Sequence, residues 1–234
     1  MKNKKIIVKD IGKTSFFDAW KYQEEVFQKI IEQKVQNRTL EKKLKTNNYL
    51  IFTEQNPVYT IGKSGDTSNL LLTESQLEDR EIEFFKINRG GDITFHGPGQ
   101  IMGYPILDLD NFFTDINLYL RSLENTIIDT LSFYDILGFT IKGETGVWVK
   151  NQNEFKKICA FGIRASRWVT MHGFSLNVNS DLNYFNNIIP CGIKDKGVTS
   201  IKDILNQEVD IGELKEKIVE NFENNFDANL VYDN

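Results

Sequence analysis

The feature that most constrains this sequence is a glycine-rich stretch at residues 89–105, RGGDITFHGPGQIMGYP. It holds five of the 16 glycines, two of the 4 prolines and one of the 2 histidines of the chain. Glycine lets a backbone approach a ligand closely or adopt positive φ, and proline fixes a turn. A tight loop between two strands would explain the Gly-Pro-Gly turn but not the Arg-Gly-Gly and the histidine beside it. We therefore interpret the stretch as a binding loop held on a rigid scaffold.

Length and composition limit the class of protein. The chain has 234 residues, 40% hydrophobic and 26% charged, which suits one large domain with a buried core. The net charge of −5 argues against a nucleic-acid binder, which needs a basic face. No apolar run reaches the roughly 18 residues of a membrane span, and the N-terminus lacks a signal-peptide pattern. We expect a cytoplasmic protein with one domain over residues 1–234 and no nucleic-acid or membrane partner.

Hydrophobic periodicity predicts several strands between a few helices. Helical spacing starts at Ser15, is clearest over residues 115–137 before Gly138, and returns at residues 214–222. The remaining polar C-terminal residues are expected to fray. Strands are expected at 5–8, 49–53, 58–61, 82–87, 93–95, 139–141, 147–149, 157–163 and 168–178. Without regular βαβ alternation, this order favours an α+β fold with a mixed, largely antiparallel sheet and flanking helices.

The segment 36–48 is basic and polar, with Arg38, Lys42, Lys43 and Lys45. We interpret it as a solvated loop or a frayed helix end. The alternative is a basic patch for an acidic partner.

The two cysteines of the chain have different surroundings. They indicate free thiols in a reducing compartment rather than a disulfide framework, and with two scattered histidines they do not form a zinc motif. We expect no metal and no cofactor. Cys159 lies in an apolar strand, which is typical of a core thiol. Cys191 lies between Pro190 and Gly192 in a turn, so it is the candidate nucleophile.

A nucleophilic thiol needs a neighbour that takes its proton. The options in this chain are His96, His172 and Lys157. Lys157 precedes an apolar strand, where partial burial favours a neutral amine, but on composition alone an ordinary solvated lysine is the better interpretation. His172 is equally compatible with a structural and a functional role. The residues alone leave the partner of Cys191 open.

Four motifs, in this order, are similar to those of the lipoyl(octanoyl) transferase family. They are RGGDITFHGPGQ at 89–100, KICAFGIR at 157–164, HGFSLN at 172–177 and PCG at 190–192. The resemblance runs from the first helix to about Ile204. It implies one catalytic domain over residues 1–234 with the fold of biotin- and lipoate-protein ligase catalytic domains.

The resemblance implies transfer of an octanoyl group from octanoyl-acyl-carrier protein to a specific lysine of a lipoyl domain, the first step of endogenous protein lipoylation. The implied acceptors are the lipoyl domains of 2-oxoacid dehydrogenase complexes and the glycine cleavage H protein, and no ATP is needed. The family's cysteine–lysine dyad falls on Cys191 and Lys157, with Cys191 carrying the acyl group as a thioester. The implied substrate-binding residues are Arg89, Gly90, Gly91, Asp92, Ile93, Thr94, Phe95, His96, Ala160, Phe161, Gly162, Gly173, Phe174 and Ser175.

Two positions depart from the family pattern, and two other functions compete with this one. Phe95 stands where tyrosine is usual, and Cys159 stands where alanine or glycine is common. The competing functions are an ATP-dependent lipoate- or biotin-protein ligase and a non-catalytic protein that binds acylated carriers or lipoyl domains. The Pro-Cys-Gly turn and the His-Gly-Pro-Gly-Gln run argue against a ligase.

Overall fold

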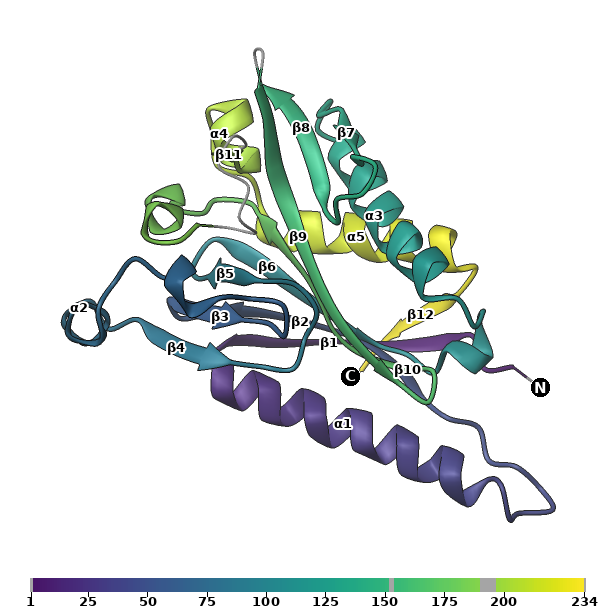
Figure 1. Ribbon diagram of the computed structural model, residues 1–234. Coiled ribbons are helices and arrows are strands. Elements are labelled where there is room, and N and C mark those ends of the chain that lie inside the picture. Colours follow the sequence, from purple (N-terminus) through teal and green to yellow (C-terminus); the bar gives the residue numbers. More distant parts are fainter. Residues whose placement is uncertain (1, 152–153, 190–196, 234) are drawn as a thin grey trace.

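A computed structural model describes residues 2–151, 154–189 and 197–233 (Figure 1). Within these residues a nine-stranded sheet forms the centre of the molecule. Its strands, in spatial order, are β12 (Asn229–Tyr232), β1 (Lys5–Thr14), β2 (Asn48–Gln55), β6 (Gln100–Ile106), β10 (Val169–Asn177), β9 (Glu154–Ser166), β8 (Val147–Asn151) and β7 (Gly138–Phe139), with β11 (Gly197–Val198) paired to β9. A second, three-stranded sheet has the order β4 (Glu83–Lys86), β3 (Val58–Ile61) and β5 (Ile93–His96).

Both sheets mix strand directions. In the large sheet, β1 pairs in parallel with β2 and β12, and the steps from β2 through β6, β10, β9 and β8 to β7 are antiparallel. In the small sheet, β3 is parallel to β4 and antiparallel to β5. The expected α+β fold with a mixed, largely antiparallel sheet is confirmed.

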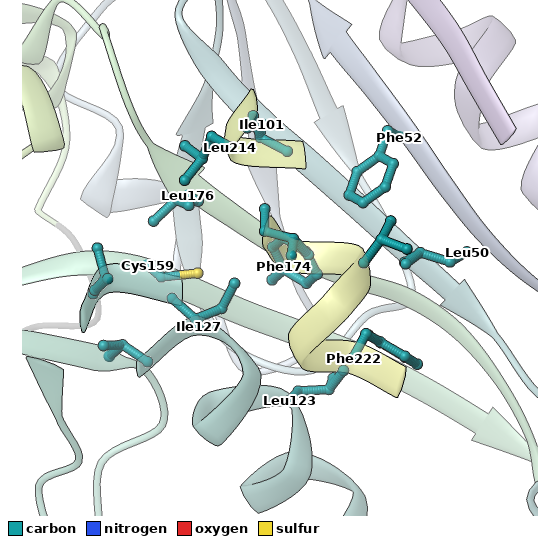
Figure 2. Packing of buried hydrophobic residues seen from close by; sticks show 14 of the residues in the cluster. Leu50, Phe52, Ile101, Leu123, Ile127, Cys159, Phe174, Leu176, Leu214 and Phe222 are labelled. Atoms are coloured by element: carbon teal, nitrogen blue, oxygen red, sulfur yellow. The ribbon is translucent and has the colours of Figure 1, made fainter. Parts of the chain in front are cut away.

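Helices cover both faces of the large sheet. The helices of the described residues are α1 (Phe16–Gln36), α2 (Glu74–Asp79), α3 (Ile116–Ser132), α4 (Ile201–Leu205) and α5 (Ile211–Phe226), with short 3-10 turns η1 (Thr67–Asn69), η2 (Leu109–Asn111) and η3 (Leu182–Asn187). α2 packs on the small sheet rather than on the large one. α3 and α5 pack on one face, where Leu123, Ile127 and Phe222 meet Phe174 and Leu176 of β10 (Figure 2). α1 packs on the other face (Figure 1). No helix of the described residues is long and apolar enough to cross a membrane.

The small sheet is attached to the start of α1. Ser15 caps this helix by accepting a hydrogen bond from the Asp18 N–H at 3.1 Å. Phe16, in the first turn, then packs with Val58 of β3 and with Ile87, which follows β4. The small sheet therefore lies on the same face of the large sheet as α1.

Three local expectations were wrong. Gly138 does not end α3, because the helix stops at Ser132 and the positive φ of 56° that turns the chain belongs to Asp135. Residues 229–232 are not frayed, because they pair in parallel with β1. Residues 100–106, interpreted as loop, form the central strand β6.

Candidate active site

A cavity of about 440 Å³ lies between the two sheets. This volume is within the roughly 300–1,000 Å³ typical of small-molecule sites. Its walls come mainly from the start of α1, from the small sheet with the 87–96 segment, from β9 and β10, and from the loop before β8, and α3, β6, η3 and β11 each add one residue. The apolar lining residues include Phe16, Ile87, Ile93, Tyr104, Phe161, Ile163, Phe174, Phe185 and Val198, and the polar ones include Arg89, Asp92, Glu144, Lys157, His172, Ser175 and Asn177.

The Arg-Gly-Gly turn at residues 89–91 joins the two sheets. The Gly90 N–H donates to the carbonyl of Ile163 at 2.9 Å, which ties the turn to β9. Arg89 is buried and donates through Nη2 to the carbonyl and Oγ1 of Thr60, at 2.7 and 2.9 Å. A Cβ on Gly162 would stand 2.7 Å from Arg89 Cδ, so glycine at this position makes room for the guanidinium stem. The glycines therefore allow the backbone and the Arg89 side chain to pack closely at the cavity wall.

The two histidines line the cavity as neutral rings. Nε2 of His96 lies 3.3 Å from Thr60 Oγ1, and Nε2 of His172 lies 3.2 Å from Asn88 Oδ1. Burial, followed by the positive charge of Arg89, lowers the pKa of each to about 3. Near neutral pH neither histidine carries the positive charge that would stabilise a thiolate. This electrostatic environment leaves Lys157 as the better candidate among the three bases considered from the sequence.

Lys157 lies in β9 and is half-buried at the cavity wall. Its Nζ is 4.6 Å from the centre of the Trp148 ring, a cation–π distance. A Cβ on Gly146 would be 3.0 Å from Lys157 Cε, so backbone packs directly on the lysine stem. On the other edge of β9, Val198 of β11 is in register with Lys157. The amine is thus held between β8 and β11 and faces the cavity.

The structure describes one of the two cysteines, Cys159. Cys159 is fully buried in the core beneath β9, as its apolar strand predicts, and burial raises the pKa of its thiol. Cys191 lies outside the described residues, as does the rest of the segment 190–196.

Nearly all of the residues expected to bind substrate lie together. Of the fourteen residues, Phe95 alone does not line the cavity. The thirteen that do are Arg89, Gly90, Gly91, Asp92, Ile93, Thr94, His96, Ala160, Phe161, Gly162, Gly173, Phe174 and Ser175. Phe95 points to the opposite face of β5, where its ring stacks on Tyr184 at 4.4 Å. Because this side chain packs away from the cavity, the missing tyrosine hydroxyl has no direct place in the lining.

Several lining residues were not found from the sequence. Phe16, Phe185 and Val198 come from three separate elements and carry no local motif. Glu144 and Thr145 precede β8 in a polar turn that resembles any surface loop. Only their position in the folded chain brings them to the cavity.

Comparison with known proteins agrees with this arrangement. A model of the lipoyl protein ligase A/B catalytic domain matches residues 15–223. The chain is 58% identical over 231 residues to an octanoyltransferase of Flavobacterium johnsoniae, covering 98% of this chain and 100% of that protein. It is 53% identical over 232 residues to an octanoyltransferase of Christiangramia forsetii, covering 98% and 99%. The chain belongs to the octanoyltransferase family. As a family member it is a transferase, which removes the non-catalytic binder from the alternatives.

Solved structures share the fold of this octanoyltransferase family member. A lipoate-protein ligase A bound with ATP superposes with a TM-score of 0.69 at 14% identity, covering 100% of this chain and 89% of that chain. A lipoate protein ligase, described as putative, from T. acidophilum with bound lipoic acid gives 0.68 at 14% identity, with the same coverage of 100% and 89%. At this identity the likeness shows the fold alone, and it confirms the expected ligase-like architecture.

Proposed function

We propose that this enzyme transfers an octanoyl group from octanoyl-acyl-carrier protein to a lysine of a lipoyl domain. The observation that carries the proposal is the amine of Lys157 at the wall of a largely apolar cavity. An acyl chain buried there gains about 0.8 kcal/mol per methylene. The names of the relatives at 58% and 53% identity support the same chemistry.

Two displacements at the acyl carbon make up the proposed reaction. The thiolate of Cys191 attacks the thioester carbonyl, a new C–S bond forms, the C–S bond to the carrier breaks, and the carrier thiol leaves with the proton that Lys157 took from Cys191. The lysine amine of the lipoyl domain then attacks the acyl-enzyme, a C–N bond forms and the bond to Cys191 breaks. Lys157 accepts the proton in each half, first from the thiol and then from the attacking amine. Conversion of a thioester to an amide is downhill, so no ATP enters.

The position of β11 supports a pairing of Cys191 with Lys157. Gly197 and Val198 follow residues 190–196 in the sequence and pair with Lys156 and Lys157. The N–H of Thr199 also donates to the carbonyl of Lys157 at 3.0 Å. The chain that carries the proposed nucleophile therefore returns, in its first described residues, alongside the proposed base.

The proposed acceptors are the lipoyl domains of 2-oxoacid dehydrogenase complexes and the glycine cleavage H protein. The basic segment at residues 38–45 is a poor docking site for an acidic carrier. It follows the C-terminal end of α1, whereas Phe16 at the N-terminal end lines the cavity. A helix of 21 residues is about 30 Å long. This distance favours the solvated-loop interpretation of the segment.

Intact-mass spectrometry tests the proposal directly. Incubation with octanoyl-acyl-carrier protein and no ATP should add one octanoyl group to the enzyme, and a lipoyl domain should then remove it. Cys191→Ser should form no hydroxylamine-labile thioester, while Cys159→Ser, at the buried thiol, should still form the adduct. Wild-type transfer by Cys191→Ser would show that another residue is the nucleophile.

The fold likeness to ATP-binding ligases gives a second candidate, an ATP-dependent ligase. The comparison that separates the two is octanoate with ATP against octanoyl-acyl-carrier protein without it. Transfer only in the presence of ATP and free acid would replace the proposed reaction by ligation.

A further inference from the structure

Among the described residues the acidic side chains of Asp108 and Glu124 are buried, and Glu124 contacts the segment before β8 that lines the cavity. Glu124 of α3 is fully buried, one position from Leu123 in the apolar face of the helix. A carboxylate in such a place is unfavourable unless it is paired and hydrogen-bonded. Glu124 Oε1 accepts the Gly146 N–H at 2.9 Å, and Oε2 lies 2.6 Å from Arg121 Nη1. Burial raises the pKa of Glu124, and the bond from Gly146 and the charges of Arg121 and Lys157 oppose that rise.

The partner of this carboxylate is the backbone that packs on Lys157. Gly146 has φ of +136°, and a Cβ there would stand 3.0 Å from both Lys157 Cε and the Cys159 carbonyl. Glu124 therefore anchors, from inside the core, a residue whose backbone lies against the lysine stem. Glu144 and Thr145, just before it, line the cavity.

Trp148 completes the surroundings of the amine. It follows Gly146 on β8, is in register with Lys157, and is 2% exposed. Its ring lies 4.6 Å from Lys157 Nζ. A buried aromatic face stabilises an ammonium group at this distance, and a buried carboxylate nearby does the same.

We infer that Glu124 is a positioning residue, which through Gly146 and its own charge holds the Lys157 amine against Trp148 at the cavity wall. The inference rests on the proposed role of Lys157 as proton acceptor. It assigns to α3, which also lines the cavity through Leu120, a part in holding the lysine amine.

The test measures the Lys157 amine itself, without turnover. Wild-type enzyme and Glu124→Gln are exposed to a brief pulse of acetic anhydride across a pH series, and acetylation of the peptide that contains Lys157 is quantified by mass spectrometry. Glutamine retains a carbonyl to accept the Gly146 N–H and removes the charge. The pH of half-maximal labelling at Lys157 should therefore fall by roughly half a unit or more. Trp148→Phe, which keeps a smaller ring, should lower it as well.

Asp129→Asn is the matched control, because it removes a charge from the solvent face of the same helix. It should leave the labelling of Lys157 unchanged. The inference is overturned if Glu124→Gln and Trp148→Phe both fold and label at Lys157 with the wild-type pH dependence. If wild-type enzyme transfers no octanoyl group but the labelling shifts appear, the proposed function fails and the positioning role stands. If transfer occurs and no labelling shift appears, the proposed function stands and the positioning role fails.

Discussion

Lys156 and Lys157 are neighbours in β9 with different surroundings. Lys157 lines the cavity over Trp148, whereas Lys156 is outside the cavity lining and is in register with Gly197 of β11. Lys157→Ala should fold and lose about 100-fold or more in octanoyl transfer, because a general base contributes roughly that much. Lys156→Ala should retain near wild-type transfer. Steady-state kinetics with octanoyl-acyl-carrier protein and a lipoyl domain check both variants.

Iodoacetamide gives a second measurement on the same pair. In Lys157→Ala, the pH at which Cys191 becomes reactive should rise, because the neighbouring base is lost. In Lys156→Ala it should stay as in wild type. Equal reactivity of Cys191 in all three proteins would remove Lys157 from the activation of the thiol.

Gly162 of β9 is a residue at which packing limits the binding loop. Alanine there would place its Cβ 2.7 Å from Arg89 Cδ and 3.1 Å from the Gly90 carbonyl. The Arg-Gly-Gly turn has to move, so Gly162→Ala should destabilise the protein by about 1–3 kcal/mol and raise KM for the acyl donor. Gly197→Ala is the control, since its nearest contact would be an ordinary 3.6 Å. Urea unfolding and transfer kinetics are the measurements, and equal effects of the two substitutions would contradict the packing argument.

For individual residues, the sequence predicted those that belong to motifs and missed those that act from the core. The 89–96 and 157–164 motifs lead to the cavity because each is contiguous along the chain. Glu124 was overlooked, although a signal exists: a carboxylate between Leu123 and Ile127 interrupts an apolar stripe. Its partner, the Gly146 N–H, is visible only in the folded chain.

Among the elements, α1 links a helix cap to the cavity. Ser15 caps the helix and Phe16, the next residue, lines the cavity. Ser15→Ala should destabilise the protein by about 1 kcal/mol, and Ser15→Asp should restore most of the loss, because aspartate is an equally good N-cap. Urea unfolding checks the stability of both variants. A stable Ser15→Ala protein would mean that packing of Phe16, rather than the cap, fixes the first turn.

The helices and most strands followed from local periodicity, and the errors occurred where pairing partners are distant. β6 contains Gly103 and Pro105, which argue against a central strand. Proline is tolerated there because pairing of β10 with β6 extends only from Gln100 to Gly103, while Pro105 pairs with Leu50 of β2. β12 depends on β1, more than 200 residues earlier in the chain, so no window of sequence contains both.

For the whole molecule, acid stability depends on His96 and His172, the 2 histidines of the chain. Burial first, and the charge of Arg89 next, lower the pKa of both to about 3 in the folded protein, against about 6.5 in the unfolded chain. Between these values the unfolded chain binds protons that the folded protein does not. The free energy of unfolding should therefore fall as pH drops below about 6.5, by roughly 1 kcal/mol per pH unit for each histidine.

The double variant His96→Gln, His172→Asn tests this dependence. Asparagine suits position 172 because His172 has φ of 61°, which asparagine tolerates better than most residues. Between pH 7 and pH 5, urea unfolding should show a smaller loss of stability in the double variant than in wild type. Parallel losses would show that carboxylates alone set the acid sensitivity.

The placement of the cavity between two sheets has a thermodynamic consequence. A ligand in the cavity contacts β5 of the small sheet and β9 and β10 of the large sheet, so a bound acyl chain connects the two sheets. By linkage, occupancy at 100 times Kd adds about 2.7 kcal/mol to the stability of whatever state closes the cavity. Separation of the two sheets is then coupled to release of the bound acyl chain. Amide hydrogen exchange in β3 and β5 should slow as the cavity fills, and so report acyl binding in the absence of turnover.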